Sequence, residues 1–189
     1  AGSRLSAISM RTTCGTSQLS RRLCAVSAGR HQTPIVDALW RKRAESRAKQ
    51  AHIVDNSLGE RTLVEKSPEQ SHNSVTYAFS SDEALSDTYR NPWGHVRAGL
   101  LLDDLDAIAG TVAFDHCASP GEKPLLLVTA SVDRIVYRHR PNLRDDITLE
   151  GRPTWVGRSS MEIGMTACSS WTREPFLEAS FTFVARDPE

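Results

Sequence analysis

Three aspartates lie within an apolar segment, residues 91–110, with the sequence NPWGHVRAGLLLDDLDAIAG. Asp103 and Asp104 fall near the first turn of the helix expected there, where the helix dipole stabilises a carboxylate by ~0.3–1 kcal/mol. Asp106 lies further in, among leucines and alanines, where an unpaired buried carboxylate costs several kcal/mol. We therefore expect Asp106 either to take part in catalysis or to pair with Arg97 or an arginine of another subunit.

Two glycines lie on the same helical stripe as Asp106. A helical residue advances by about 100°, so Gly99 returns to within about 20° of Asp106 and Gly110 lies about 40° further round. Such a stripe allows a backbone or a flat ligand to approach the carboxylate closely. The N–H groups of Ala98, Gly99 and Leu100, at the start of the helix, are expected to lack helical partners. They would stabilise a carbonyl oxygen that gains negative charge, as acyl transfer requires.

Other polar residues near this helix have less specific patterns. Asn91 precedes a proline, where an asparagine either caps a turn or orients a water molecule. His95 and His116 flank the helix, but neither shares a face with Asp106 at the spacing of a catalytic dyad. Cys117 and Cys168 show no CxxC or Cys/His spacing, so we expect small buried residues and no zinc site or disulfide framework.

The elements that position these residues follow from the period of the apolar pattern. Residues 74–80 alternate as a half-buried strand does, and four further strands are expected, separated by turn residues, at 124–140, 146–157, 159–171 and 176–186. The apolar side chains of the helix cover more than half of its circumference, which suits a helix wrapped by a curved sheet. The predicted fold class is α+β, with a five-stranded antiparallel sheet around one long central helix. Trp93 and Trp155 are expected in the core or at a dimer contact.

The amino-terminal part of the chain differs in composition from the rest. Residues 1–50 carry ten Lys and Arg against two acids, whereas the remainder carries thirteen against twenty-one. We predict a basic arm at 1–33 that resembles a transit peptide or binds RNA or an acidic partner. A charged helix and linker are expected at 34–70, with Thr33 as the N-cap, Pro34 as the first helical residue, and an apolar edge of Ile35, Leu39 and Trp40. The main domain is predicted at 71–189.

The spacing of Asn91, Gly94, the pair Ala98-Gly99 and Asp106 resembles that of the hotdog-fold acyl-CoA thioesterases. The phrases VTASVDRI, GRPTWVGRSSMEI and ASFTFVARDPE are similar to the first domain of the mitochondrial acyl-CoA thioesterases that carry two tandem hotdog domains. This resemblance covers residues 71–189. One departure is Arg97-Ala98-Gly99 at the helix start, where many members have His-Gly or Gly-Gly, so the oxyanion contact is expected to depend on Gly99 more than on Ala98.

The resemblance implies hydrolysis of a fatty acyl-CoA to the free acid and CoA, without a metal or cofactor. In the implied mechanism Gly99 N–H polarises the thioester carbonyl, Asp106 acts as general base or nucleophile, and Asn91 helps to hold the water. In this family the Asn-bearing turn of one hotdog unit faces the acidic residue on the helix of another. The resemblance therefore implies a homodimer or a second hotdog domain as partner, and a location in the mitochondrial matrix.

The sequence also suggests a site for the CoA phosphates and two alternatives to thioester hydrolysis. Arg158, Ser159 and Ser160 lie at a turn between two strands, where they either bind the CoA phosphates or form a solvated turn. The second function is a non-catalytic, thioesterase-derived subunit of a mitochondrial assembly such as a ribosome or respiratory complex. The third is a hotdog hydratase, which needs an Asp and a His working together. No stretch has the ~20 apolar residues of a membrane span, and no specific nucleic-acid motif is found.

Overall fold

A computed structural model describes residues 33–51, 64–119 and 125–186 of the chain. Its strands are β1 (Asn73–Tyr77), β2 (Leu126–Tyr137), β3 (Ile147–Val156), β4 (Ser160–Ser169) and β5 (Pro175–Arg186). Its helices are α2 (Pro34–Ala51), α3 (Glu83–Tyr89) and α4 (Ala98–Cys117), with a short 3-10 helix, η1 (Pro68–Ser71). The predicted basic arm lies outside the described residues except for Thr33.

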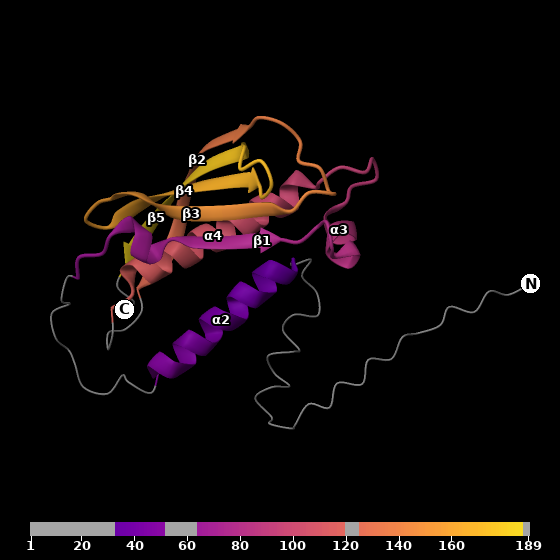
Figure 1. Ribbon diagram of the computed structural model, residues 1–189. Coiled ribbons are helices and arrows are strands. Elements are labelled where there is room, and N and C mark those ends of the chain that lie inside the picture. Colours follow the sequence, from indigo (N-terminus) through magenta and orange to yellow (C-terminus); the bar gives the residue numbers. More distant parts are fainter. Residues whose placement is uncertain (1–32, 52–63, 120–124, 187–189) are drawn as a thin grey trace, which may run out of the picture. The chain divides into compact units, whose positions relative to one another are not determined.

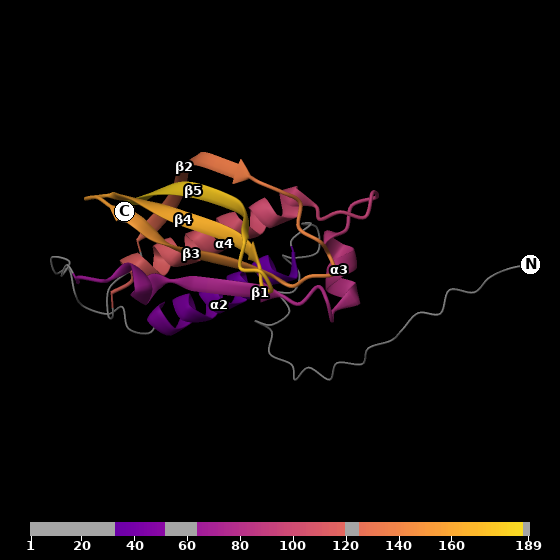
Figure 2. The ribbon, with the colours of Figure 1, turned by 45° about the horizontal axis from the view of Figure 1, so that its top comes forward.

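The five strands form one antiparallel sheet in the order β1-β3-β4-β5-β2, with α4 packed across one face (Figures 1 and 2). α4 contacts all five strands. The predicted α+β arrangement of a five-stranded antiparallel sheet around a long helix is therefore confirmed. The edge strands are β1 and β2, which come far apart in the sequence and lie at opposite sides of the sheet.

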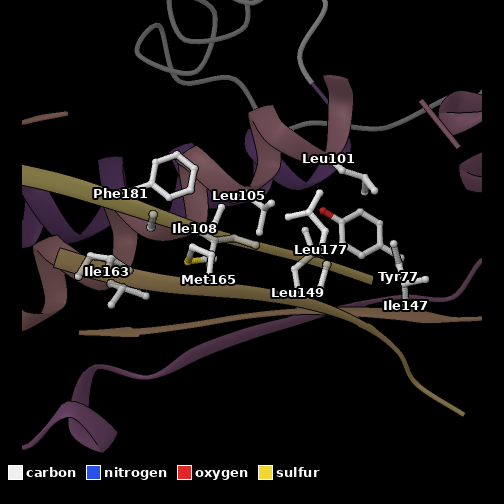
Figure 3. Close-up of a cluster of buried hydrophobic side chains, with 14 of the residues drawn as sticks. Tyr77, Leu101, Leu105, Ile108, Ile147, Leu149, Ile163, Met165, Leu177 and Phe181 are labelled. Carbon is white, nitrogen blue, oxygen red and sulfur yellow. The ribbon is translucent and has the colours of Figure 1, made fainter. Parts of the chain in front are cut away.

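The core forms where the apolar face of α4 meets the inward-pointing side chains of the strands (Figure 3). Leu101, Leu105 and Ile108 of α4 are fully buried, as the predicted periodicity requires. Alternate residues of β4, such as Ile163 and Met165, point toward the helix because successive strand side chains point to opposite faces. This packing fixes the rotation of α4 about its axis, and so determines which aspartate is buried and which remains accessible.

α3 was not among the predicted elements. Asp82 is its N-cap, and Asp82 Oδ1 accepts a hydrogen bond from the backbone N–H of Leu85 at 2.9 Å. Glu83 follows in the first turn, where a carboxylate is favoured. A helix of seven residues is too short to produce an apolar period of 3.6, so the signal was confined to this cap.

α2 begins as predicted. Thr33 Oγ1 accepts a hydrogen bond from the N–H of Val36 at 3.2 Å, as an N-cap does. The apolar contact with the body differs from the prediction, because Val36 is buried and Leu39 packs against the core, while Trp40 is 52% exposed. The side chain of Ile35 and residues 52–54 lie outside the described residues, and the boundary at residue 71 stays a prediction.

Candidate active site

Asp106 lines a cavity of about 200 Å³ between α2, α4, β2 and β5. Thr129 of β2 donates a hydrogen bond from Oγ1 to Asp106 Oδ1, with the two atoms 3.4 Å apart. The residue is exposed rather than buried, so the expectation of a buried carboxylate at 106 was wrong. Among the described residues, no ion pair joins Asp106 to Arg97. The carboxylate is accessible to a ligand that enters the cavity.

The protonation of Asp106 is shifted by its position on one wall of this cavity. Burial on the protein side raises the pKa of the Asp106 carboxyl, the hydrogen bond from Thr129 opposes that rise, and the charge of Asp103 adds to it. A carboxylate with a raised pKa is a stronger base than an ordinary surface aspartate, and a raised pKa brings a general base nearer to neutral pH. Asp106 therefore has the accessibility and basicity that a general base needs.

The buried aspartate is Asp104, which the sequence analysis had placed in the helix-dipole role. It is fully buried, and its carboxylate accepts hydrogen bonds from Thr33 Oγ1, from Tyr77 Oη at 2.6 Å and from Tyr89 Oη at 2.5 Å. Burial raises the pKa of Asp104, and the three hydroxyl donors partly offset that rise. Thr33 directly precedes α2, Tyr77 belongs to β1 and Tyr89 belongs to α3. The carboxylate of Asp104 therefore connects these three elements to α4.

The role of Asp104 had a signal in the sequence that the helix-dipole interpretation overlooked. Asp104 lies three residues after Leu101 and four before Ile108, both of which are fully buried. Positions separated by three and four residues share one face of a helix. The apolar stripe of α4 therefore passes through Asp104, whereas Asp106 lies beside it.

The start of α4 provides two of the three N–H groups that were expected to be free. Arg97 is the N-cap residue, and its carbonyl oxygen accepts from Leu100 N–H at 3.0 Å and from Leu101 N–H at 3.4 Å. The expectation for Leu100 was therefore wrong, since a tight first turn satisfies its N–H. Within the described part of the chain, the N–H groups of Ala98 and Gly99 have no partner. Gly99 is exposed, and a β-carbon placed on it would meet no atom within 4 Å beyond its chain neighbours and the backbone of its own helix.

Asn91 caps the turn that leads into α4. Its Oδ1 accepts hydrogen bonds from the backbone N–H of Trp93 at 3.0 Å and of His95 at 2.9 Å. Gly94 completes the turn with a φ of 79°, a conformation that favours glycine. The turn-capping interpretation of Asn91 is confirmed. Because the oxygen is occupied, the side-chain amide nitrogen is the group that remains for a ligand or water.

Arg158 and Ser159 lie in the turn between β3 and β4, and Ser160 begins β4. The turn is closed by a hydrogen bond from Gly157 N–H to Ser160 O at 2.7 Å, and Ser159 O accepts from Ala185 N–H at 2.8 Å. Ser160 pairs with Val184, which pairs with Val128 of β2. This row of residues is adjacent to the row that holds Thr129, so the turn lies at the same end of the sheet as the Asp106 cavity.

One chain brings only some of the predicted site residues together. Asp106 and Gly110 line the same cavity, whereas Asn91, Gly99 and the turn at 158–160 do not line it. Thr129 was missed by sequence reasoning, because its role arises from a contact between β2 and α4 that no local pattern indicates.

His116, Trp93 and Trp155 do not line the Asp106 cavity. His116 Nδ1 is 2.9 Å from Ser71 Oγ, and burial together with the charge of Lys66 lowers the pKa of His116. Trp93 and Trp155 are 79% and 58% exposed, so the expectation of a core position was wrong for both. A dimer contact for these tryptophans stays a prediction.

The cysteines, possible metal ligands and possible membrane spans were also addressed by the sequence. Cys168 is buried as expected, whereas Cys117 is only half-buried. No group of three His, Cys, Asp or Glu within residues 33–51, 64–119 and 125–186 could hold a metal ion. In those same ranges, no helix is both long enough and apolar enough to cross a membrane.

Comparison with known proteins agrees with this fold. Residues 94–174 match the model of the thioesterase superfamily. The structure is similar to an acyl-CoA hydrolase of Staphylococcus aureus, with a TM-score of 0.55 and 22% identity over 65% of this chain and 67% of the other. It is also similar to a Streptococcus mutans protein bound to acetyl CoA, with a TM-score of 0.51 and 22% identity over 71% and 99% of the two chains. The body of the chain has the hotdog fold, and residues 94–174 match the thioesterase superfamily.

Curated relatives extend the comparison to between 82% and 89% of the chain. The chain is 43% identical to "Acyl-coenzyme A thioesterase 4, mitochondrial" of Humulus lupulus, over 88% of this chain and 33% of the relative. It is 38% identical to the chloroplastic acyl-coenzyme A thioesterase 2 of the same plant, over 89% and 40%. It is 32% identical to the mitochondrial acyl-coenzyme A thioesterase 9 of Mus musculus, over 82% and 37%. The chain thus spans 33–40% of the length of these relatives, and the predicted resemblance to acyl-CoA thioesterases is confirmed.

Proposed function

We propose that the chain hydrolyses acyl-CoA thioesters, with Asp106 as the general base. The observation that supports this best is the accessible Asp106 carboxylate, which lines a cavity and has a pKa raised by burial. The names of the relatives above supply the substrate class, since each is an acyl-coenzyme A thioesterase. None of the relatives reported above is named for a structural role in a large assembly, so nothing in the comparison favours the non-catalytic alternative.

In the proposed reaction, Asp106 takes a proton from a water molecule whose oxygen attacks the thioester carbonyl carbon. The N–H of Gly99 donates to the carbonyl oxygen as that oxygen gains negative charge. The carbon–sulfur bond then breaks, and the CoA sulfur receives the proton from Asp106. The products are the free carboxylic acid and CoA, and Asp106 returns to its ionised state. The amide nitrogen of Asn91, whose oxygen is occupied, donates a hydrogen bond that positions the water.

A second hotdog unit completes the site in this proposal. Asn91 and Gly99 do not line the Asp106 cavity of their own chain, so the turn of one unit has to meet the carboxylate of another. β2 is the edge strand beside the cavity, and its side chains of Val128, Val132 and Ile135 are 45–49% exposed. An exposed apolar edge strand is a ready template for pairing. A second copy or a second domain paired along β2 would lie next to Asp106.

The CoA moiety and the location are further parts of the proposal. Arg158, Ser159 and Ser160 bind the CoA phosphates through charge-assisted hydrogen bonds, and the support is the position of their turn at the cavity end of the sheet.

The protein functions in the mitochondrial matrix, with the basic arm as its targeting sequence. Two of the three relatives reported above are named mitochondrial and one chloroplastic.

Mixing two inactive variants tests whether the site is shared. Asn91→Asp keeps the oxygen that caps the turn and removes the NH₂ donor, while Asp106→Asn removes the base. Each variant alone should lose thiol release from acyl-CoA. In a homodimer, an equal mixture should recover about a quarter of wild-type activity, because half of the dimers are mixed and each mixed dimer has one intact site. Wild-type protein that releases no CoA from any acyl-CoA would contradict the proposed function.

A further inference from the structure

α2 forms one wall of the cavity that contains Asp106. Leu39 and Trp40 of α2 line this cavity together with Leu127 of β2 and Phe183 of β5. α2 lies outside residues 94–174, the segment that matches the thioesterase superfamily. The strands β1 and β5 also lie outside that segment, so the family match alone does not describe this wall of the cavity.

The position of α2 is fixed by a buried polar anchor at its first turn. Thr33 Oγ1 donates to the buried carboxylate of Asp104 and accepts from Val36 N–H, so one hydroxyl both caps α2 and ties it to α4. Val36 is only 8% exposed. Leaving a buried carboxylate without this donor would cost roughly 1–3 kcal/mol, so the anchor holds the start of α2 in place. Leu39 and Trp40 lie one to two turns after the anchor.

The lining of the cavity combines one reactive group with both polar and apolar surface. Asp106 and two threonines supply the polar atoms, whereas Leu39, Leu127 and Phe183 supply apolar surface. This is the combination expected for a pocket that holds a hydrocarbon group next to the carbonyl it is attached to. The cavity of about 200 Å³ is smaller than the roughly 300–1,000 Å³ of most small-molecule sites, so it fits a short acyl group or the first part of a longer one.

We infer that α2 is the wall of the acyl-chain pocket and that Leu39 and Trp40 set the length of the acyl group that the site accepts. This inference rests on the proposed thioester hydrolysis and adds its specificity determinant. Leu39 is half-buried between the cavity and the core, so its size controls the depth of the pocket. Trp40, 52% exposed, covers the cavity from the solvent side.

Substitutions that change the size of Leu39 in opposite directions test the inference. Leu39→Ala should raise, and Leu39→Trp should lower, the ratio of kcat/KM for long-chain to short-chain acyl-CoA substrates. A change of about tenfold in each direction is expected, since one methylene in an apolar pocket is worth about 10–200-fold. Trp40→Ala should change the ratio in the direction of Leu39→Ala. Trp171→Ala is the matched control, because Trp171 is 90% exposed and does not line the cavity.

A parallel binding experiment separates this inference from the proposed function. Equilibrium titration with non-hydrolysable thioether analogues of acyl-CoA, from two to sixteen carbons (roughly the range of biological acyl groups), measures chain-length preference without turnover. If wild type binds the analogues but hydrolyses no acyl-CoA, the proposed function fails, and opposite shifts in binding preference would still support the wall. If both Leu39 variants lower affinity equally at every length while thermal unfolding shows that they are folded, the inference is wrong.

Discussion

Thr129 Oγ1 on β2 and Asp106 Oδ1 on α4 lie 3.4 Å apart, so the edge strand of the sheet directly contacts the carboxylate of the candidate base. The hydrogen bond favours the ionised form of Asp106, against the burial that raises its pKa. Any partner that pairs along β2 would lie beside this contact. The edge strand therefore contributes directly to the protonation of Asp106 through Thr129.

Removal of the Thr129 hydroxyl should move the pH dependence of hydrolysis. The ionised form of Asp106 is the active one, so kcat/KM falls at low pH with a midpoint above the 3.8 of an unperturbed aspartate. Thr129→Val removes the contact that lowers the pKa, and the acidic limb should shift to higher pH. Thr111→Val is the matched control, because Thr111 lines the same cavity but donates to Ala107 O. An unchanged limb in Thr129→Val would contradict the role given to this contact.

Gly99→Ala should separate the catalytic and the structural reasons for a glycine at this position. The added methyl group meets no atom within 4 Å, so the fold should be retained. Alanine is the better helix former, and the free energy of unfolding should rise by up to about 1 kcal/mol. Hydrolysis should fall, because the methyl group occupies the approach to the N–H of Gly99. Urea unfolding and thiol release measure the two effects, and a variant with full activity would show that this N–H does not contact the substrate.

The buried Asp104 carboxyl should give the protein a pH-dependent stability. Its folded-state pKa is raised, so its contribution is fully present below the unfolded pKa of about 3.9 and is lost as pH rises through the folded pKa. Asp104→Asn does not titrate. The free energy of unfolding of wild type minus that of Asp104→Asn should therefore fall as pH rises above the unfolded pKa of about 3.9. A difference that stays constant or rises in urea unfolding at several pH values would exclude a raised pKa at Asp104.

A charge on the edge strand should prevent a second unit from pairing along β2. Val132 is 45% exposed on this strand, and Val132→Lys would place a charge in the proposed contact. The native mass by light scattering should fall to that of a single chain, and hydrolysis should be lost with it. Val156→Lys is the control, because Val156 is 49% exposed but lies on the interior strand β3. Unchanged mass and activity in Val132→Lys would place the partner elsewhere.

The architecture could be predicted because its signals are local and repeated. Alternation along β1 and the long apolar helix each recur over many residues, and the five strands and α4 formed as expected. α3 could not be predicted from periodicity, because seven residues make too few turns to show a repeating pattern. Its N-cap at Asp82 was the one local sign.

The aspartates show where prediction of the site reached its limit. Spacing from Gly99 drew attention to Asp106, which lines a cavity, but the prediction of a buried carboxylate there was wrong, because Asp104 occupies the core. The partners of Asp104 come from residues 15, 27 and 71 positions away in the sequence. Such long-range hydroxyl contacts leave no pattern in a single sequence. The same holds for Thr129, which meets Asp106 only through the packing of β2 against α4.

The central claim is tested most directly by comparing two neighbouring aspartates. Asp106→Asn and Asp103→Asn make the same chemical change on exposed residues of one helix, but only Asp106 lines the cavity. We predict that Asp106→Asn loses thiol release from acyl-CoA by at least about a hundredfold, the contribution typical of a general base. Asp103→Asn should stay near wild type. Full turnover in Asp106→Asn, with the same unfolding behaviour as wild type, would contradict the account.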